Sequence, residues 1–440
     1  MNRIAFLFAA ISVTMSAAAD VPSVSSVSFS PGSGRDAAVI SYTLENAPAV
    51  VTVDVQTNAL ADGSGEWTSI GGISMGELQG DANRLVSASG RKTAAWLPGT
   101  YWQNNALPAA QMRVVVKAWE TNSPPDYLVV NLTGNKNDVR FYVSTNDFPG
   151  GFSSRAYKTT KLVMRKIPAK NVVWLMGSPA RLDDANNATT NSPAHRVMLT
   201  YDYYAGIYEL TQSQYVNIGG VNESKFADEE NADVLPAEKL SYATVRGAIA
   251  TYKWATNGHS VDSSSPIGKL REKSGIADMD FPTEAEWEYA CRAGSSTELY
   301  SDLAKTAANV RYIAWTRTDT SKTKEVGTKP PNAWGLYDTI GNVWEFCLDA
   351  SGVNSYLSGF HSSLASGWQT GGVTTDPKGA NNTSGRVMRR GGSWYEQATV
   401  REQSASDRTD CNPAWDYSSS VGATGCRIFC SVGAATKCAD

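Results

Sequence analysis

The stretch from residue 335 to 349, GLYDTIGNVWEFCLD, sets the strongest constraint on how this chain can fold. Asp338 and Glu345 supply hard oxygen donors, and Gly341 and Asn342 between them let the backbone turn so that main-chain carbonyls can face the same point. Calcium prefers this mixture of carboxylate and carbonyl oxygens. The stretch therefore predicts a calcium-binding turn. The alternative is a turn into a core strand, with Glu345 solvated and the neighbouring aromatic side chains buried.

Further motifs appear in a fixed order around this stretch. They are MGS at 176–178, IYELTQSQY at 207–215, LPAEKLSYA at 235–243, FPTEAEWEYACRAG at 281–294, VGTKPPNAWGLYDTIGNVWEF at 326–346, RRGGSW at 389–394 and GCRI at 425–428. Over roughly residues 160 to 432 this order resembles the formylglycine-generating enzymes, also called sulfatase-modifying factors. The resemblance implies an α+β domain of the C-type-lectin-like fold, in which two helices and short strands accompany long irregular loops.

The length and charge of the chain bound its organisation. A chain of 440 residues is expected to form two domains. The net charge is -4, and because the Lys and Arg residues are scattered, no basic patch favours nucleic acid or an anionic membrane. Residues 1–19 read as a secretory signal, with Arg3, an apolar run at 4–13 and three alanines before Asp20. The run is shorter than the ~20 residues of a membrane span. We expect a secreted, periplasmic or cell-surface protein.

The first domain, residues 20–150, is expected to be an all-β sandwich. Apolar and polar residues alternate at 40–44, 51–56, 112–118 and 127–132, which predicts half-buried strands. Several such strands without helical runs favour the immunoglobulin or fibronectin type, as a spacer or docking domain. Trp96, Tyr101 and Trp102 either cap the core or form a sugar-binding face. Gly and Pro near residue 150 indicate a linker at 151–160 before the second domain, 161–440.

Two helices are expected in the second domain. Residues 240–254 show apolar side chains near helical spacing. The next helix is marked more clearly, because Thr283 and Glu286 form a capping box and Gly294 ends the helix. Glu286 resembles a catalytic acid, but the capping box gives it a structural role.

The cysteines and histidines suggest other constraints. Cys291, Cys347, Cys411, Cys426, Cys430 and Cys438 make an even number, which in an exported protein suggests disulfides whose pairing the sequence does not rank. The family resemblance favours a bridge from Cys291 to Cys430 or Cys426, with Cys347 as a buried thiol. His195, His259 and His361 lie in unlike contexts, so a three-histidine iron site is not expected.

The family resemblance also implies a ligand set for calcium. The better-matched site takes the side chains of Asp338 and Glu345 and the carbonyls of Gly341 and Val343. Asn309, with the carbonyl of Val310, matches part of a second calcium site whose remaining carboxylate has no counterpart here. Bound metal would order long loops, because its binding free energy adds to the free energy of folding.

The catalytic positions of the family differ in this chain. Relatives that oxidise cysteine with oxygen bind copper(I) through two cysteines that follow the GGS-aromatic motif, since soft thiolates suit that ion. Here the motif ends at Ser393 and Trp394, and the two cysteine positions hold Glu396 and Arg401. We therefore do not expect copper. A different reaction on Glu396, Arg401 and Arg408 is one reading, and a Glu-Arg salt bridge that lines a cleft is the other.

Three functions follow from these observations. The first is an exported protein that binds a peptide or glycan in the family's cleft, near Ser393, Glu396 and Arg401, with loops stabilised by calcium. The second is an active formylglycine-generating oxidase that acts on a sulfatase cysteine. The third is a structural protein of the cell surface. Whether the chain is an enzyme is not decided by the sequence.

Overall fold

The structure is a computed structural model, and it describes residues 20–30, 37–103, 105, 107–177, 194–247, 261–351, 372–377, 386–398, 403–411 and 423–437. The expected signal at 1–19 lies outside these residues, as do His259, His361, Arg401 and Cys438. No helix among the described residues is long and apolar enough to cross a membrane.

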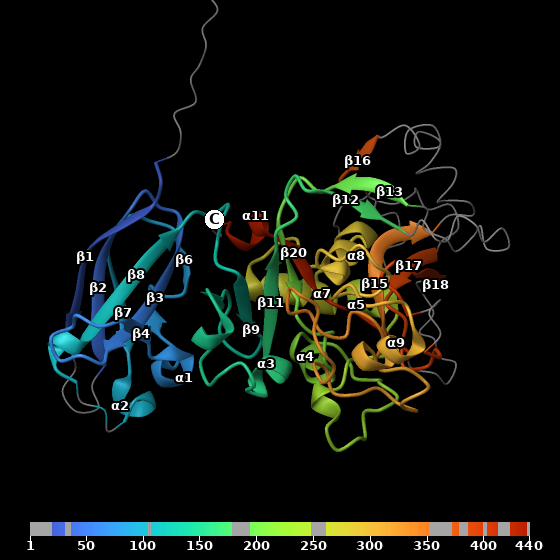
Figure 1. The fold of residues 1–440 in the computed structure, drawn as a ribbon, viewed down its shortest axis with the longest axis horizontal. Coiled ribbons are helices and arrows are strands. Elements are labelled where there is room, and N and C mark those ends of the chain that lie inside the picture. Colours follow the sequence, from blue (N-terminus) through green and yellow to red (C-terminus); the bar gives the residue numbers. More distant parts are fainter. Residues whose placement is uncertain are drawn as a thin grey trace, which may run out of the picture.

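The N-terminal part is a sandwich of two antiparallel sheets (Figure 1). One sheet has the order β1 (Ser23–Ser30), β2 (Ala38–Glu45), β7 (Gly90–Trp96) and β5 (Gln79–Gly80). The other joins β4 (Trp67–Ser69), β3 (Ala49–Asn58) and β6 (Arg84–Val86), and β8 (Met112–Trp119) also pairs with β3. In β2 the side chains alternate between buried and more exposed along the strand, as the sequence predicts. The all-β fold of this part is confirmed.

The aromatic group of the sandwich lies in its core. Trp96 is 1% exposed and packs against Trp102 with a ring-centroid distance of 5.8 Å. Tyr101 is exposed on the short helix α2 (Pro98–Tyr101). A sugar-binding face would need the rings on the surface, so the core-capping interpretation describes Trp96 and Trp102.

A five-stranded sheet joins the two parts of the chain. Its order is β10 (Val139–Tyr142), β9 (Tyr127–Asn131), β11 (Lys161–Ile167), β14 (Tyr203–Gly206) and β20 (Phe429–Ser431). The strand expected at 127–132 is present, but β9 pairs with β11, with Leu128 opposite Met164, and not with the sandwich strands. The boundary expected near residue 150 therefore falls inside this sheet.

Smaller sheets and helices complete the second part. One sheet joins β12 (Val173–Met176), β13 (His195–Met198) and β16 (Val373–Thr375), and another has the order β18 (Arg408–Cys411), β17 (Arg386–Arg390), β15 (Trp344–Ser351) and β19 (Thr424–Gly425). The helices include α3 (Ala156–Thr159), α4 (Gln212–Asn217), α5 (Tyr242–Arg246), α7 (Pro266–Ser274), α8 (Glu284–Arg292), α9 (Ala307–Ile313) and α11 (Val432–Ala435). The described part of the helix expected at 240–254 is α5, which ends before Gly247, and residues 248–254 lie outside the described part of the chain. The expected linker at 151–160 contains α3.

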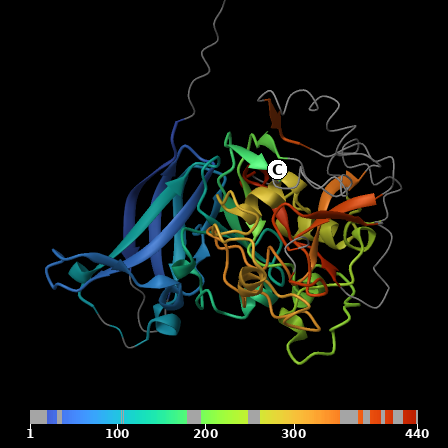
Figure 2. The ribbon, with the colours of Figure 1, turned by 45° about the vertical axis from the view of Figure 1, so that its right-hand side comes forward.

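The two parts share buried contacts. Val50 of the sandwich belongs to the same hydrophobic cluster as Leu128, Phe141 and Tyr204. The backbone of Phe141 donates to the carbonyl of Asn83 at 2.7 Å. In Figures 1 and 2, β9 and β11 lie between the sandwich and the remaining elements. The bridging sheet therefore fixes the sandwich against the second part through both packing and hydrogen bonds.

Candidate functional site

The conformation of the turn at 335–343 depends on residues with positive φ angles. Asp338 and Asn342 have φ angles of 54°, and Gly341 has a φ of 88°. A Cβ on Gly341 would lie 2.7 Å from the carbonyl oxygen of Trp315, so only glycine fits here without a backbone shift. The Asn342 side chain then accepts from the Lys324 backbone at 2.9 Å and donates to Glu209 at 2.7 Å. The turn is thus tied to two segments that lie far away in the sequence.

Glu345, the second residue of β15, is buried and not solvated. It is 0% exposed, and its two carboxylate oxygens accept from Arg427 at 2.6 to 3.1 Å and from the indole of Trp287 at 2.7 Å. Arg427 also donates to the carbonyls of Gly206 and Tyr337. The ion pair therefore connects β15, α8, β14 and the turn before β15.

The surroundings of this ion pair are acidic. Glu209, which is 0% exposed, accepts from the backbone of Val343 at 3.0 Å. Burial, with the nearby Asp338 and Glu345 carboxylates, raises the pKa of Glu209. Burial also raises the pKa of Asp338 to about 6. Three buried carboxyl groups thus face the single guanidinium of Arg427, and ionisation of all three would leave excess negative charge.

The predicted calcium ligands fit this geometry only in part. The buried Oδ1 of Asp338 has no hydrogen-bond partner, while its Oδ2 accepts from Gly327 at 2.6 Å. That free carboxylate oxygen is of the type that a hard cation takes as a ligand. Glu345 does not fit, because Arg427 and Trp287 occupy both of its oxygens. In the described part of the chain, no group of three or more His, Cys, Asp or Glu side chains is arranged to hold a metal ion.

The weaker calcium candidate has another role. The Asn309 side chain donates to the carbonyl of Ala304 at 2.7 Å, at the start of α9. The backbone of Asn309 is in turn bound by Thr306, the N-cap of that helix. These contacts give Asn309 a local part in shaping the helix start.

Ser393 and Glu396 contact each other. The Ser393 hydroxyl, which is buried, donates to the Glu396 carboxylate, and the indole of Trp344 donates to its other oxygen at 2.9 Å. The Glu396 carbonyl accepts from the backbone of Arg317 at 2.8 Å. Glu396 is therefore held by neutral donors, and a hard carboxylate engaged in this way does not suit copper(I).

Aromatic and basic side chains surround Glu396. We call this set the Glu396 surface; it comprises the exposed or partly exposed Trp315, Arg317, Tyr395 and Glu396, together with the buried Trp344 and Trp394. The guanidinium of Arg317 lies 4.9 Å from the ring centroid of Tyr395, and Lys329 lies 4.2 Å from that of Trp315. Tyr395 is 39% exposed. Such stacked pairs present flat apolar faces with positive charge.

The remaining charged candidates are structural. Arg408 donates to Glu284 at 2.8 Å, and Arg390 donates to Glu284 and Glu288 at 2.7 and 3.0 Å. Of the two arginines that could have joined Glu396 in a reaction, Arg408 is thus held at α8, and Arg401 lies outside the described residues. Glu286 accepts from the Thr283 backbone at 2.7 Å in the predicted capping box, and also from Tyr201.

The expected disulfide is not formed in the described residues. Cys291 is a free, buried thiol, and so are Cys347, Cys426 and Cys430. Cys291 and Cys347 pack in one hydrophobic cluster, whereas Cys426 and Cys430 pack in another. The predicted disulfide between Cys291 and Cys430 or Cys426 is therefore wrong for this structure. Cys347 is the buried thiol that we expected.

Several residues that shape the site were not found as site residues from the sequence. Glu209, Trp287 and Arg427 all lie inside the quoted motifs, but their pairing joins residues that are 58 to 134 positions apart, which spacing does not reveal.

The fold and the site together define a class of protein: an α+β domain of irregular loops, organised by buried ion pairs and preceded by an all-β sandwich. Residues 159–422 match the family of sulfatase-modifying factor enzyme 1-like domains, FGE-sulfatase. The chain belongs to this family. Its second domain has the C-type-lectin-like fold of that family, as the resemblance implied.

Several known relatives carry the name of the family's enzyme. The chain is 27% identical over 283 residues to the formylglycine-generating enzyme of Bos taurus, covering 56% of this chain and 68% of the relative. It is 34% identical over 265 residues to that of Mus musculus, covering 52% and 66%. The chain thus spans about two thirds of these relatives. A solved structure, Treponema denticola variable protein 1, has a TM-score of 0.46 at 23% identity, covering 61% of this chain and 95% of that one.

Proposed function

We propose that this chain is an exported, ligand-binding member of its family, and that it binds a peptide segment at the Glu396 surface without oxidising it. The supporting observation is the position of Glu396, whose carboxylate is bound by Ser393 and Trp344 where the oxidases of the family have a thiolate. A carboxylate held by neutral donors leaves no soft ligand for copper(I) at that position.

A peptide is favoured over a glycan by the charge of the surface. The side chains of Arg317 and Lys324 contact aromatic rings, those of Tyr395 and Trp315 respectively. Nearby acids are engaged elsewhere, since Asp319 pairs with Arg311 and Glu229 pairs with Lys322. Acidic and aromatic peptide side chains complement such a surface. A glycan would stack on the rings but would leave the basic groups without partners.

Peptide and glycan arrays, followed by calorimetry on the hits, test this proposal. We expect peptides with acidic residues to bind, and we expect Tyr395→Ala to weaken binding about tenfold, since a stacked pair contributes on the order of 1 kcal/mol or more when desolvated. Tyr312→Ala, which removes an exposed tyrosine on α9, is the control and should bind like the parent. Equal weakening by both variants would contradict the assignment. An absence of ligands on both arrays would favour a structural surface protein.

The alternative function is that of an active formylglycine-generating oxidase, which the names of the relatives favour. Incubation with copper, oxygen and a peptide containing Cys-x-Pro-x-Arg tests it. We expect an unchanged peptide mass and no copper held through thiols. Conversion of the peptide cysteine to an aldehyde, or stoichiometric copper binding, would establish the oxidase and remove the first proposal.

Calcium remains part of the proposal, with Asp338, Gly341 and Val343 as its protein ligands. Glu345 would contribute only if it exchanged Arg427 for the metal. A bound cation would offset the excess of carboxyl groups around Arg427. We expect the melting temperature to fall when calcium is removed with a chelator, and the difference to disappear in Asp338→Asn. Equal melting of the parent with calcium and with chelator would exclude this site.

A further inference from the structure

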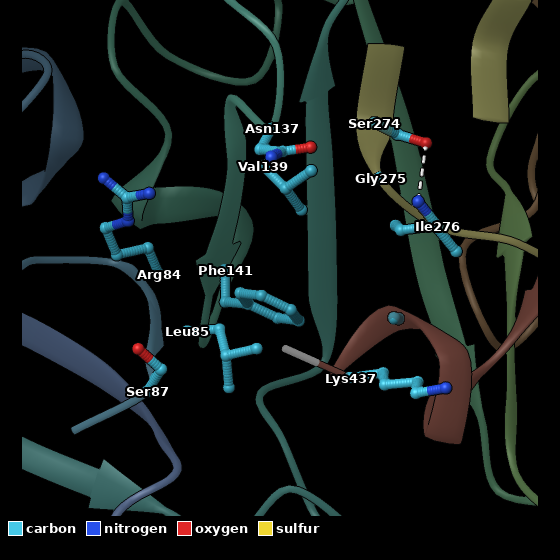
Figure 3. Close-up of a pocket in the computed structure, with 11 residues that line it drawn as sticks. Arg84, Leu85, Ser87, Asn137, Val139, Phe141, Ser274, Gly275, Ile276 and Lys437 are labelled. Atoms are coloured by element: carbon cyan, nitrogen blue, oxygen red, sulfur yellow. Dashed lines mark hydrogen bonds between the residues drawn. The ribbon is translucent and has the colours of Figure 1, made fainter. Parts of the chain in front are cut away.

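A pocket lies at the junction of the sandwich and the second part of the chain (Figure 3). Its volume is about 160 Å³. Four segments form it: the region of β6, the region of β10, the end of α7 and the end of α11. None of the residues discussed for the Glu396 surface or the acidic turn lines this pocket.

The centre of the pocket is apolar. Phe141 and Ile276 are 1% and 3% exposed, and Leu85 and Val139 pack against the same hydrophobic cluster. An enclosed cavity of about 150 Å³ that is lined only by Leu, Ile and Phe takes up benzene, and the apolar part of this pocket contains the same residue types. The pocket therefore has room and surface for a group of the size of one aromatic ring.

The walls are fixed by the backbone. Gly275 has a φ of 74°, and a Cβ at this position would lie 2.4 Å from the side-chain oxygen of Asn137. The backbone of Asn137 donates to the carbonyl of Lys273 at 2.8 Å, and that of Ile276 donates to the hydroxyl of Ser274 at 3.2 Å, which is the dashed line in Figure 3. The pocket is thus formed before any ligand arrives, which lowers the entropic cost of binding.

The charged residues that line the pocket are all basic. They are Arg84 and Lys437, and the part of the lining that the structure describes contains no Asp or Glu. Neither side chain makes a hydrogen bond or ion pair with any residue that the structure describes. Two acids near the lining in sequence are engaged in ion pairs: Glu272 of α7 pairs with Lys136, and Asp138, next to β10, pairs with Arg140. Figure 3 places Arg84 and Lys437 on opposite sides of Phe141.

The end of α7 does not cancel this positive charge. The carbonyl of Arg271 accepts from Gly275 at 2.9 Å, and that of Lys273 accepts from Asn137. Two of the carbonyls that would carry negative partial charge at the helix end are therefore already bound. Long basic side chains such as those of Arg84 and Lys437 can turn toward an anion at either rim of the pocket.

We propose that this junction pocket binds a small amphipathic carboxylate, with an apolar group of about one ring against Phe141 and Ile276 and the carboxylate beside Arg84 or Lys437. Because its walls come from the sandwich and from the second part, the ligand would stabilise their association. This proposal does not depend on the function of the Glu396 surface.

Ligand-observed NMR on the whole protein tests the proposal with three probes that differ only in charge: 3-phenylpropionate, 3-phenylpropanol and 3-phenylpropylamine. For a ligand of this size we expect a Kd on the order of 1 mM for the carboxylate. The alcohol should bind about tenfold more weakly and the amine more weakly still. Inorganic phosphate alone should not compete, because it lacks the apolar group.

Variants assign the binding to this pocket. The double variant Arg84→Gln with Lys437→Gln should lose the preference for the carboxylate while it melts like the parent, since neither side chain has a hydrogen-bond or ion-pair partner among the described residues. Arg91→Gln, an exposed arginine on β7 of the same sandwich, is the control and should leave all three affinities unchanged. Equal affinity for the three probes, absence of carboxylate binding at about ten times the expected Kd, or an unchanged preference in the double variant would each overturn the proposal.

Discussion

Arg427 is the only guanidinium hydrogen-bonded to Glu345 among the described residues, and Glu209 and Asp338 lie beside that pair. We expect Arg427→Met to lower the free energy of unfolding by about 3–5 kcal/mol, since it leaves a buried carboxylate without its partner. Urea denaturation measures this loss. Arg165→Met, which removes a partly exposed pair with Asp126, is the control and should cost no more than about 1 kcal/mol. Similar losses in both variants would contradict a central role for Arg427.

Asp349 gives a pH dependence that can be tested. Burial and the neighbouring Glu284 raise the pKa of Asp349 to about 8. Since this value lies above that of an unfolded aspartate, ~3.9, the native state holds the proton more tightly, and the contribution to stability is complete at low pH and is lost as the pH rises toward about 8. Asp349→Asn keeps an oxygen for the Glu284 backbone, which donates to Asp349 at 2.7 Å.

We therefore expect the asparagine variant to lose less stability than the parent between about pH 5 and about pH 8. Melting temperatures of both proteins across this range measure the difference. An equal loss in the two proteins would mean that the Asp349 carboxylate is already ionised in the folded protein at about pH 5, and the stated direction of the pKa shift would then be wrong.

At the level of elements, α8 connects two strands of the second domain, because its side chains form hydrogen bonds with Glu345 on β15 and Arg390 on β17. Its N-cap Thr283 accepts from the backbone of Glu286 at 3.1 Å. We expect Thr283→Ala to lower the free energy of unfolding by about 1 kcal/mol, as the loss of a cap usually does. Thr283→Ser keeps the hydroxyl and should remain close to the parent in urea denaturation. If the serine variant lost as much as the alanine variant, packing of the methyl group would explain the effect.

The helix start illustrates what the sequence could predict. Thr283 and Glu286 are three positions apart, so their interaction is local and visible as a pattern, and the alternation in β2 is equally local. The partners of Glu345 and of β9 are not local. The ladder between β9 and β11 joins Leu128 to Met164, and no pattern within either strand specifies its partner. The expected cysteine bridge followed from the family resemblance, which does not include the packing of this chain.

At the scale of the molecule, the bridging sheet makes the two parts of the chain depend on each other. Val50 comes from the sandwich, yet it is 0% exposed in the cluster that contains Leu128 and Phe141. The side chain of Thr436 in the last described segment donates to the carbonyl of Thr121 at 2.8 Å, which adds a contact between distant parts of the sequence. A domain that folded independently would keep its buried residues within its own core. We therefore expect one cooperative unfolding transition that includes the sandwich and the second domain.

Calorimetry of the parent and of Val50→Ala tests this expectation. The loss of two buried methyl groups and the resulting cavity should lower the free energy of unfolding by about 2 kcal/mol. Because the cluster is shared, the single endotherm should move to lower temperature as a whole. Val39→Ala removes a side chain that is 41% exposed on β2, and it should leave the endotherm in place.

Two endotherms in the parent, with only one of them shifted by Val50→Ala, would show that the sandwich unfolds alone and that the junction contributes little to stability. The junction pocket would then be a surface between loosely associated domains, and a ligand bound there would raise the temperature of neither transition by much.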